Sequence, residues 1–226
     1  MEIILGETAG FCFGVANAVN KTIEELEKNK KKYCLGKLVH NEKVTNELVD
    51  KGLILINDIM EAPAFSDVII RAHGVEPIVY EKAKEKNINI IDLTCPIILK
   101  IHDIVSEYAK QGYFVILTGN KNHPETVGSK GFAGENSVIV ENENELEAIK
   151  DKIKKNDIKK ILLVSQTTFS VEKFNNIEKE LVNIDRNIEI EVRRTICNAT
   201  ATRQKETENI SKKVDLMIII GREKQF

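Results

Sequence analysis

The chain has 226 residues, with 33 Lys and Arg against 35 Asp and Glu, and its formal net charge is −2. This balance indicates no nucleic-acid partner, and the longest apolar run, 216–220, is far below the roughly 20 residues of a membrane-spanning helix. The first ten residues lack the basic and long apolar segments of a signal peptide. The four Cys residues include no closely spaced pair, so we expect a cytoplasmic protein without a disulfide scaffold.

Short apolar runs alternate with amphipathic stretches along the chain. We expect strands over 3–5, 33–36, 53–56, 68–71, 88–91, 114–118, 137–140, 161–165, 189–192 and 216–220. We expect helices over 15–28, 43–51, 78–86, 98–111, 143–154, 171–182 and 200–213. The strands are nearly all apolar, as strands covered on both faces are. The alternation predicts an α/β fold with mainly parallel sheets.

Residues capable of chemistry follow the carboxyl ends of these strands, which is where open α/β sheets bind ligands. They are Cys12, His40, His73, Thr94, Cys95, His123, Glu125, the run 165–168 and Cys197. Cys34 lies inside a predicted strand and His102 inside a predicted helix, so we interpret both as structural. We therefore expect a single functional edge that carries three Cys and three His residues.

A repeat is visible in the spacing of Cys and Gly. Three Cys residues each precede a helical stretch and then a strand that ends in Gly. The pairs are Cys12 with Gly36, Cys95 with Gly119 and Cys197 with Gly221, and 36 − 12, 119 − 95 and 221 − 197 all equal 24. His40 and His123 lie four residues beyond their Gly, where the third unit has Gln225. We interpret this as three related α/β units, over 1–94, 95–196 and 197–226.

Each unit would present its Cys at a helix N-terminus, where the partial positive charge of the helix lowers the pKa of a thiol. Three thiolates without a nearby fourth fit an iron–sulfur cluster that keeps one iron open. A structural zinc site would take four protein ligands. A zinc hydrolase that uses the His, Glu and Cys residues of this edge stays an alternative.

The remaining residues of the edge suit an anionic substrate. His and Thr side chains can donate hydrogen bonds to phosphate oxygens. Glu125 lies two residues after His123 and follows Pro124, and it is the natural proton donor of the group. The Gly residues form neither a dinucleotide-binding nor a P-loop motif, so neither a nicotinamide nor an ATP site is expected.

Seven motifs give the chain a family resemblance. They are GFCFGV (10–15), LVHN (38–41), RAHGV (71–75), DLTCP (92–96), HPE (123–125), SQTT (165–168) and TICNATATRQ (195–204). In this order and at these spacings they resemble 4-hydroxy-3-methylbut-2-enyl diphosphate reductase, an iron–sulfur enzyme of the methylerythritol phosphate route to isoprenoids. The resemblance extends from residue 10 to about residue 221, which is nearly the whole chain.

The resemblance implies a trefoil-like arrangement of three α/β units around a [4Fe-4S] cluster held by Cys12, Cys95 and Cys197. It implies that the substrate loses its 4-hydroxyl group by two-electron reduction, which yields isopentenyl and dimethylallyl diphosphates. Glu125 would deliver the proton and Thr167 would lie near the reacting end. His40, His73 and His123 would contact the diphosphate and the hydroxyl side. A ferredoxin or flavodoxin would supply the electrons.

The chain departs from the family pattern in its last residues. The family continues with a Gly-rich turn and a Ser-Ser-Asn signature that cradles the diphosphate, whereas this chain reads IIIGREKQF, with Arg222 in place of a second Gly. We therefore expect an incomplete, truncated third unit. A catalytically impaired remnant that still binds the cluster is the second alternative.

Overall fold

The computed structural model describes residues 2–28, 31–155, 158–184 and 187–220. Arg222 and Gln225 lie outside the described residues. The chain divides into two compact units by its contacts. The first comprises Met1–Ala72, Lys86–Leu93 and Asn198–Phe226, and the second comprises His73–Glu85 and Thr94–Cys197. The repeat units 1–94, 95–196 and 197–226 are defined by sequence spacing instead, and they stay a prediction.

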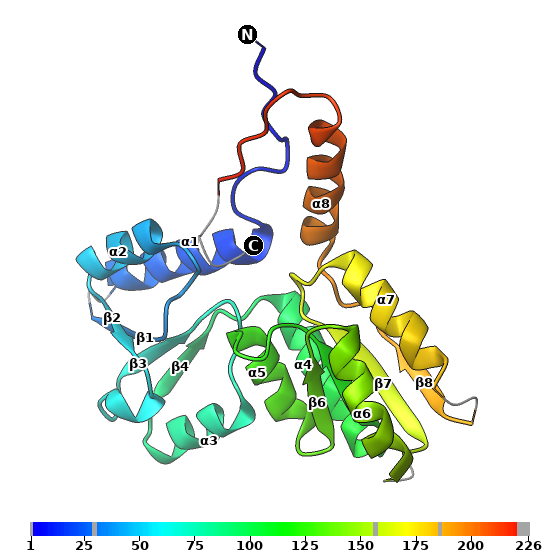
Figure 1. Cartoon of the computed structure of the whole chain (residues 1–226). Coiled ribbons are helices and arrows are strands. Elements are labelled where there is room, and N and C mark those ends of the chain that lie inside the picture. Colours follow the sequence, from blue (N-terminus) through cyan, green and yellow to red (C-terminus); the bar gives the residue numbers. More distant parts are fainter. Residues whose placement is uncertain (1, 29–30, 156–157, 185–186, 221–226) are drawn as a thin grey trace. The chain divides into compact units, whose positions relative to one another are not determined.

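The first unit contains a sheet of four short parallel strands, in the order β2-β1-β3-β4. The strands are β1 (Lys32–Leu35), β2 (Leu53–Ile56), β3 (Asp67–Ile70) and β4 (Asn89–Asp92). Helices α1 (Phe13–Lys28) and α2 (Glu42–Asp50) cover one face of this sheet (Figure 1). Ala18 and Leu26 of α1 and Leu48 of α2 pack there with Cys34 and Ile69 of the strands, because apolar residues recur on one face of each helix. A short 3₁₀ helix, η1 (Ile59–Glu61), lies between β2 and β3.

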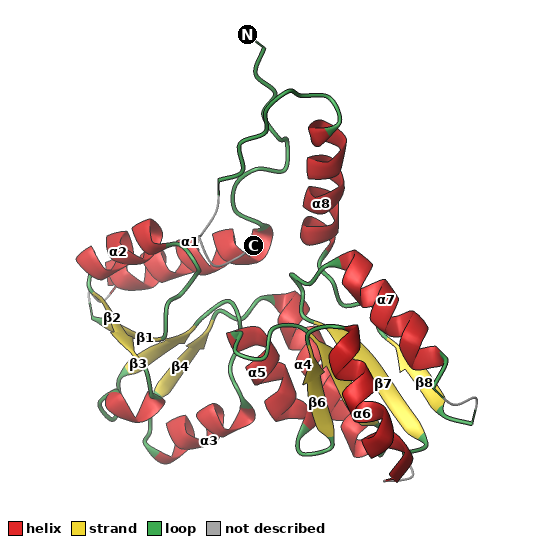
Figure 2. Ribbon diagram, viewed as in Figure 1, coloured by secondary structure: helices red, strands yellow, loops and turns green. Residues whose placement is uncertain are grey.

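The second unit is a sheet between two layers of helices (Figure 2). Its parallel strands run in the order β6-β5-β7-β8 and are β5 (Phe114–Thr118), β6 (Ser137–Val140), β7 (Lys160–Ser165) and β8 (Glu189–Val192). Helices α4 (Pro96–Lys110) and α5 (Pro124–Ala133) cover one face. Helices α6 (Glu143–Lys155) and α7 (Val171–Val182) cover the other. Helix α3 (Pro77–Glu85) also belongs to this unit.

The two sheets share one topology, because β1 to β4 and β5 to β8 follow each other across their sheets in the same order. Each sheet is parallel at every described pairing. The buried, β-branched sequences of the strands are typical of sheets covered by helices. The predicted α/β fold with parallel sheets is therefore confirmed, and the shared order is what a sequence repeat would produce.

Two predicted strands are wrong, and helices α5 and η1 were not predicted. Residues 3–5 and 216–220 carry no strand, although their apolar sequences favour one, because no neighbouring strand pairs with them among the described residues. Their side chains are largely exposed, with Leu5 at 81% and Ile220 at 95%. Helix α5 was not predicted because Gly128 and Gly131 interrupt its sequence.

Helix α8 (Asn198–Ser211) has no buried residue along its length. Polar bonds connect it to the N-terminal segment of the same unit. The Glu206 carboxylate accepts hydrogen bonds from the N–H of Glu7 (2.6 Å) and of Thr8 (3.2 Å). Arg203 donates to the carbonyl oxygens of Thr8 (3.0 Å) and Gly10 (2.8 Å). Among the described residues no helix is both long and apolar enough to cross a bilayer.

Candidate functional site

The carboxyl edge of the second sheet holds a buried carboxylate. Glu125 lies in the first turn of α5, and Thr167 is the second residue after β7. The Thr167 N–H donates to Oε1 of Glu125 at 2.6 Å, and the Thr167 hydroxyl donates to Oε2 at 2.8 Å. Glu125 is only 2% exposed. Both carboxylate oxygens are therefore held by a single residue of the neighbouring strand end.

The protonation of Glu125 is set by two opposing effects. Burial raises its pKa to about 7, because a charged carboxylate loses its hydration inside the protein. The hydrogen bonds from Thr167 to the charged form oppose this rise and are too weak to cancel it. A carboxyl group with a pKa close to neutrality can both hold and release a proton near pH 7, which is what a general acid needs.

The same strand end anchors the segment that carries Cys197. The Cys197 N–H donates to the carbonyl oxygen of Thr167 at 2.9 Å. Two residues earlier, the Thr195 hydroxyl accepts from the Ser165 N–H at 2.7 Å and donates to the Ser165 carbonyl oxygen at 2.6 Å. Backbone bonds through Thr167 therefore link the position of Cys197 to that of Glu125.

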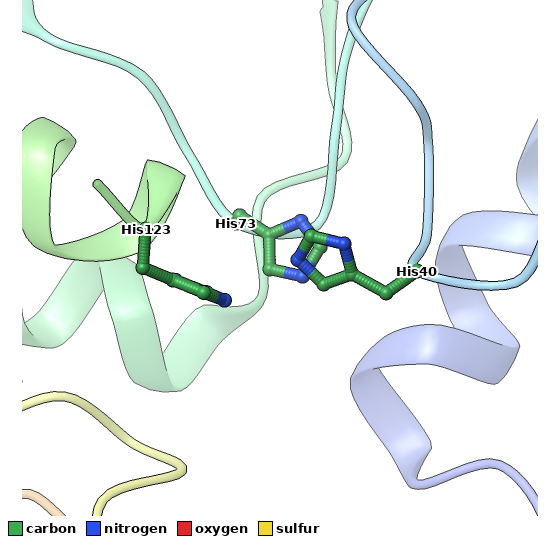
Figure 3. Close-up of side chains that lie close together, drawn as sticks. All are labelled: His40, His73 and His123. Atoms are coloured by element: carbon green, nitrogen blue, oxygen red, sulfur yellow. The ribbon is translucent and has the colours of Figure 1, made fainter. Parts of the chain in front are cut away.

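Two predicted histidines of the second unit lie side by side. The rings of His73, in the loop after β3, and His123, before α5, have centroids 5.4 Å apart and meet edge to face at 84° (Figure 3). His123 caps α5, because its Nδ1 accepts from the Glu125 N–H at 3.2 Å. An accepting Nδ1 carries no proton, so in the neutral ring Nε2 bears the hydrogen and can donate it to an anion.

Close packing positions the loop that carries His73. The glycines of α5 let this helix approach the residues after His73, since a Cβ at Gly131 would lie 2.9 Å from the Glu76 side chain and one at Gly128 would lie 3.3 Å from Val75. His102 is 2% exposed, stacks on Phe132 at 4.2 Å, and lies against Gly74. His102 is thus buried within the packed interior of the unit, as the structural interpretation expected.

The three predicted ligand cysteines share one local setting. Cys12 directly precedes α1, Cys95 precedes α4 and Cys197 precedes α8, so the prediction of a Cys at each helix N-terminus is confirmed. None of the three forms a disulfide and all are half-buried, whereas Cys34 is fully buried in the core of the first sheet. Burial raises the pKa of the Cys34 thiol to about 12. Cys34 therefore packs as a small apolar residue, as predicted.

The first unit contributes Cys12 and His40. His40, also labelled in Figure 3, lies half-buried in the loop between β1 and α2. The next residue, Asn41, caps α2 by accepting a hydrogen bond from the Val44 N–H at 3.2 Å. The cap fixes where α2 begins and so places the loop that carries His40 at the carboxyl edge of its own sheet.

The comparisons with known proteins identify the family of the chain. The LytB protein family model matches residues 3–225. The reductase of Clostridioides difficile strain 630, named 4-hydroxy-3-methylbut-2-enyl diphosphate reductase, is 39% identical over 222 residues, which are 98% of this chain and 77% of the relative. The enzyme of the same name from Caldanaerobacter subterraneus is 39% identical over 98% of this chain and 75% of its own length. The chain belongs to the LytB family.

Two solved structures of the family have the same fold. The E-1-hydroxy-2-methyl-but-2-enyl-4-diphosphate reductase from Plasmodium falciparum superposes with a TM-score of 0.84 and 36% identity, over 95% of this chain and 66% of that one. A second structure is described as (E)-4-hydroxy-3-methyl-but-2-enyl diphosphate reductase, the terminal enzyme of the non-mevalonate pathway. It superposes with a TM-score of 0.75 and 38% identity, over 99% of this chain and 78% of that one. As a member of the LytB family, this chain is a reductase.

Arg71 was not singled out from the sequence, and Gln166 was included only as part of the run 165–168. Arg71 and Gln166 are the first residues after β3 and β7, and both side chains lie over a glycine of the neighbouring strand end. The sequence signal for them was their place beside His73 and Thr167 in the motifs RAHGV and SQTT. The signal for α5 was Pro124 after a capping residue, a typical helix start.

Proposed function

We propose that this LytB-family chain reductively removes the 4-hydroxyl group of 4-hydroxy-3-methylbut-2-enyl diphosphate at a [4Fe-4S] cluster. The products would be isopentenyl and dimethylallyl diphosphates, together with one water. The reaction consumes two electrons and two protons for each hydroxyl removed. The observation that carries this proposal is the buried Glu125, with its pKa of about 7, hydrogen-bonded to the same residue that anchors Cys197.

Cys12, Cys95 and Cys197 would hold the cluster. Their thiols are half-buried and form no disulfide, and each lies next to the N-terminal N–H groups of a helix, which stabilise negative charge. Three Cys ligands suit a cluster whose fourth iron is open. When bound, the cluster supplies electrons and a Lewis-acid position for the hydroxyl group. A ferredoxin or flavodoxin would renew the electrons, and a reducing cytoplasm would keep the thiols free.

Glu125 would deliver a proton to the departing hydroxyl group. Its protonated form is well populated near neutral pH because burial disfavours the carboxylate. Thr167 orients the carboxyl group through two hydrogen bonds, and its own hydroxyl would lie near the reacting end of the substrate. We infer that Thr167 sets the direction of proton delivery.

His40, His73 and His123 would bind the anionic and hydroxyl ends of the substrate. Nδ1 of His123 accepts the hydrogen bond of the helix cap, so Nε2 would be the atom that donates to an oxygen of the substrate. His73 lies against His123, so both rings can reach the same group of oxygens. His40 extends the set from the carboxyl edge of the first sheet.

Anaerobic purification followed by iron and sulfide analysis tests the cluster. We expect brown protein, loss of the cluster in Cys95→Ser, and an unchanged cluster in Cys34→Ala, the matched control for loss of one thiol. Turnover is then measured with the allylic diphosphate and a reduced viologen. A loaded cluster without turnover would favour the impaired remnant, and colourless protein with bound zinc would favour the hydrolase. Either result contradicts the proposal.

A further inference from the structure

Arg71 occupies a confined position at the carboxyl edge of the first sheet. It is the first residue after β3, and Gly36 is the first residue after β1, the neighbouring strand. Gly36 has a φ of +74°, and a Cβ added there would overlap Nη1 of Arg71 and lie 3.3 Å from its Cζ. The guanidinium group therefore lies directly against the backbone at residue 36.

The charge of this guanidinium group is not neutralised. Its Nε atom is buried without a hydrogen-bond partner in the described part of the chain, and no carboxylate there forms an ion pair with it. The thiol of Cys34 is the titratable group that acts on it, and burial keeps that thiol neutral. Burial lowers the pKa of Arg71 itself. Removing an ion from water without a counter-ion is unfavourable.

The second sheet shows that the fold does not need a cation at this position. Gln166 is the first residue after β7 and lies over Gly119, whose added Cβ would be 2.7 Å from the Gln166 Cβ. Its side chain is fully used: Oε1 accepts from the Asn120 N–H at 3.0 Å and Nε2 donates to the Thr168 hydroxyl at 2.7 Å. A neutral amide therefore occupies the corresponding position of the second sheet, and both its oxygen and its nitrogen form hydrogen bonds.

We propose that Arg71 binds the diphosphate group of the substrate, as a fixed positive charge at the carboxyl edge of the first sheet. This inference rests on the proposed function. Arg71 lies two residues before His73, and its guanidinium group covers the glycine that lies four residues before His40. Neutral imidazoles donate hydrogen bonds but do not offset the charge of a diphosphate, whereas a guanidinium group does both, in a geometry that matches two phosphate oxygens.

The neighbouring cation does not serve the same purpose. Lys37, next to Gly36 in the chain, forms an ion pair with Glu42 at 2.9 Å, and both side chains are largely exposed, at 44% and 68%. An exposed, paired lysine is screened by solvent and contributes little to anion binding. Lys37 is therefore the matched control for the loss of one positive charge from this edge.

Calorimetric titration of the full chain with inorganic diphosphate tests the proposal, together with the thermal midpoint of each ligand-free variant. Arg71→Gln gives the first sheet the residue type that Gln166 provides in the second sheet. Arg71→Met is the second variant. We expect both to raise the Kd for diphosphate about tenfold or more, the usual size for a lost charge-assisted hydrogen bond. We expect unchanged or higher thermal midpoints, because an uncompensated buried charge is removed. Lys37→Gln should change the Kd less than about twofold, as expected for an exposed pair.

Four results would overturn the proposal. They are a wild-type chain that does not bind diphosphate, an unchanged Kd in the Arg71 variants, an equal loss in Lys37→Gln, and lower thermal midpoints in both Arg71 variants. The last would show that Arg71 supports the loop instead of binding the anion. These measurements need neither turnover nor a loaded cluster. A chain that binds diphosphate through Arg71 but lacks the reductase reaction would therefore contradict only the proposed function.

Discussion

Glu42 and Glu125 occupy the same place in the two sheets, two residues after His40 and His123, yet only Glu125 is buried. Glu42 is 68% exposed and pairs with Lys37. The difference begins on the neighbouring strand. The second residue after β7 is Thr167, which donates two hydrogen bonds to Glu125, whereas the second residue after β3 is Ala72, which has no hydroxyl. The same strand order thus carries a buried carboxyl group with a pKa of about 7 in one sheet and only a surface ion pair in the other.

The comparison also shows how a repeat divides its chemical roles. Directly after β3, the first sheet has the cation Arg71. Directly after β7, the corresponding strand of the second sheet, stands the neutral Gln166. The backbone is the same in topology, and a glycine opposite makes room in both cases. The first edge is therefore suited to hold charge and the second to move a proton.

The largest expected effect is on Glu125. Glu125→Gln should keep the cluster and lower kcat by about 10²–10⁴-fold, the usual contribution of a general acid. In the wild type, kcat should fall as the pH rises through about 7, because the proton is then lost from Glu125. Steady-state kinetics across pH with a reduced viologen measure both.

Glu42→Gln is the matched control for that change, because it alters the equivalent residue of the other sheet. We expect its kcat to stay within about twofold of the wild type, as for an exposed ion pair. Comparable losses in the two variants would mean that the burial of Glu125 has no catalytic significance.

The next largest effect is on the pH dependence of the free energy of unfolding. The folded-state pKa of Glu125, about 7, lies above the ordinary value of 4.5. The stabilising contribution of this group is therefore fully present below pH 4.5 and is lost as the pH rises to about 7. Relative to Glu125→Gln, the wild type should lose about 3 kcal/mol of unfolding free energy across that interval. Urea unfolding of both proteins at several pH values measures the difference, and parallel curves would refute it.

A smaller effect is expected at Gly36. Gly36→Ala should destabilise the chain by about 2–3 kcal/mol, through its positive φ and its overlap with Arg71. Gly112→Ala shares the positive φ, +82°, but meets no atom within 4 Å, so it should cost only about 1 kcal/mol. Thermal unfolding compares the two. In an Arg71→Ala background the cost at Gly36 should fall to that at Gly112, and an unchanged cost would argue against the packing described.

The smallest effect is expected at Thr195. Thr195→Val leaves the N–H and carbonyl of Ser165 without their partner and should cost about 1–2 kcal/mol. It should also lower kcat, because Cys197 and Glu125 are both fixed through Thr167. Thr118→Val removes a hydroxyl that bonds to the Ser165 hydroxyl, and this change should lower stability without lowering kcat. Equal kinetic losses in both variants would assign Thr195 a merely structural role.

Most elements could be predicted because burial patterns are local. Strands such as Leu53–Ile56 and helices such as Val171–Val182 were predicted with the bounds that the structure has. Residues 3–5 and 216–220 were predicted wrongly, because a strand also needs a partner, which an apolar run does not reveal. Helix α5 was missed because its glycines serve packing against residues 75–77, a requirement set by tertiary structure.

The candidate site could be predicted as a set of residues but not as a set of interactions. Spacing and motif placed Glu125 and Thr167 at the same edge, since strand ends meet there in parallel sheets. The burial that raises the pKa of Glu125 depends on how α5 packs, which no local pattern shows. The confinement of Arg71 depends on the glycine opposite it in the sheet, 35 residues earlier in the chain (71 − 36 = 35).

The exposed polar contacts between α8 and the N-terminal segment bear on how firmly Cys12 is held. Cys12 follows a segment that Glu206 and Arg203 hold by polar bonds alone, without any buried side chain from α8. Polar contacts that are exposed to water open more readily than packed cores unfold, and salt weakens them. The position of Cys12 therefore depends on contacts that water and salt can weaken.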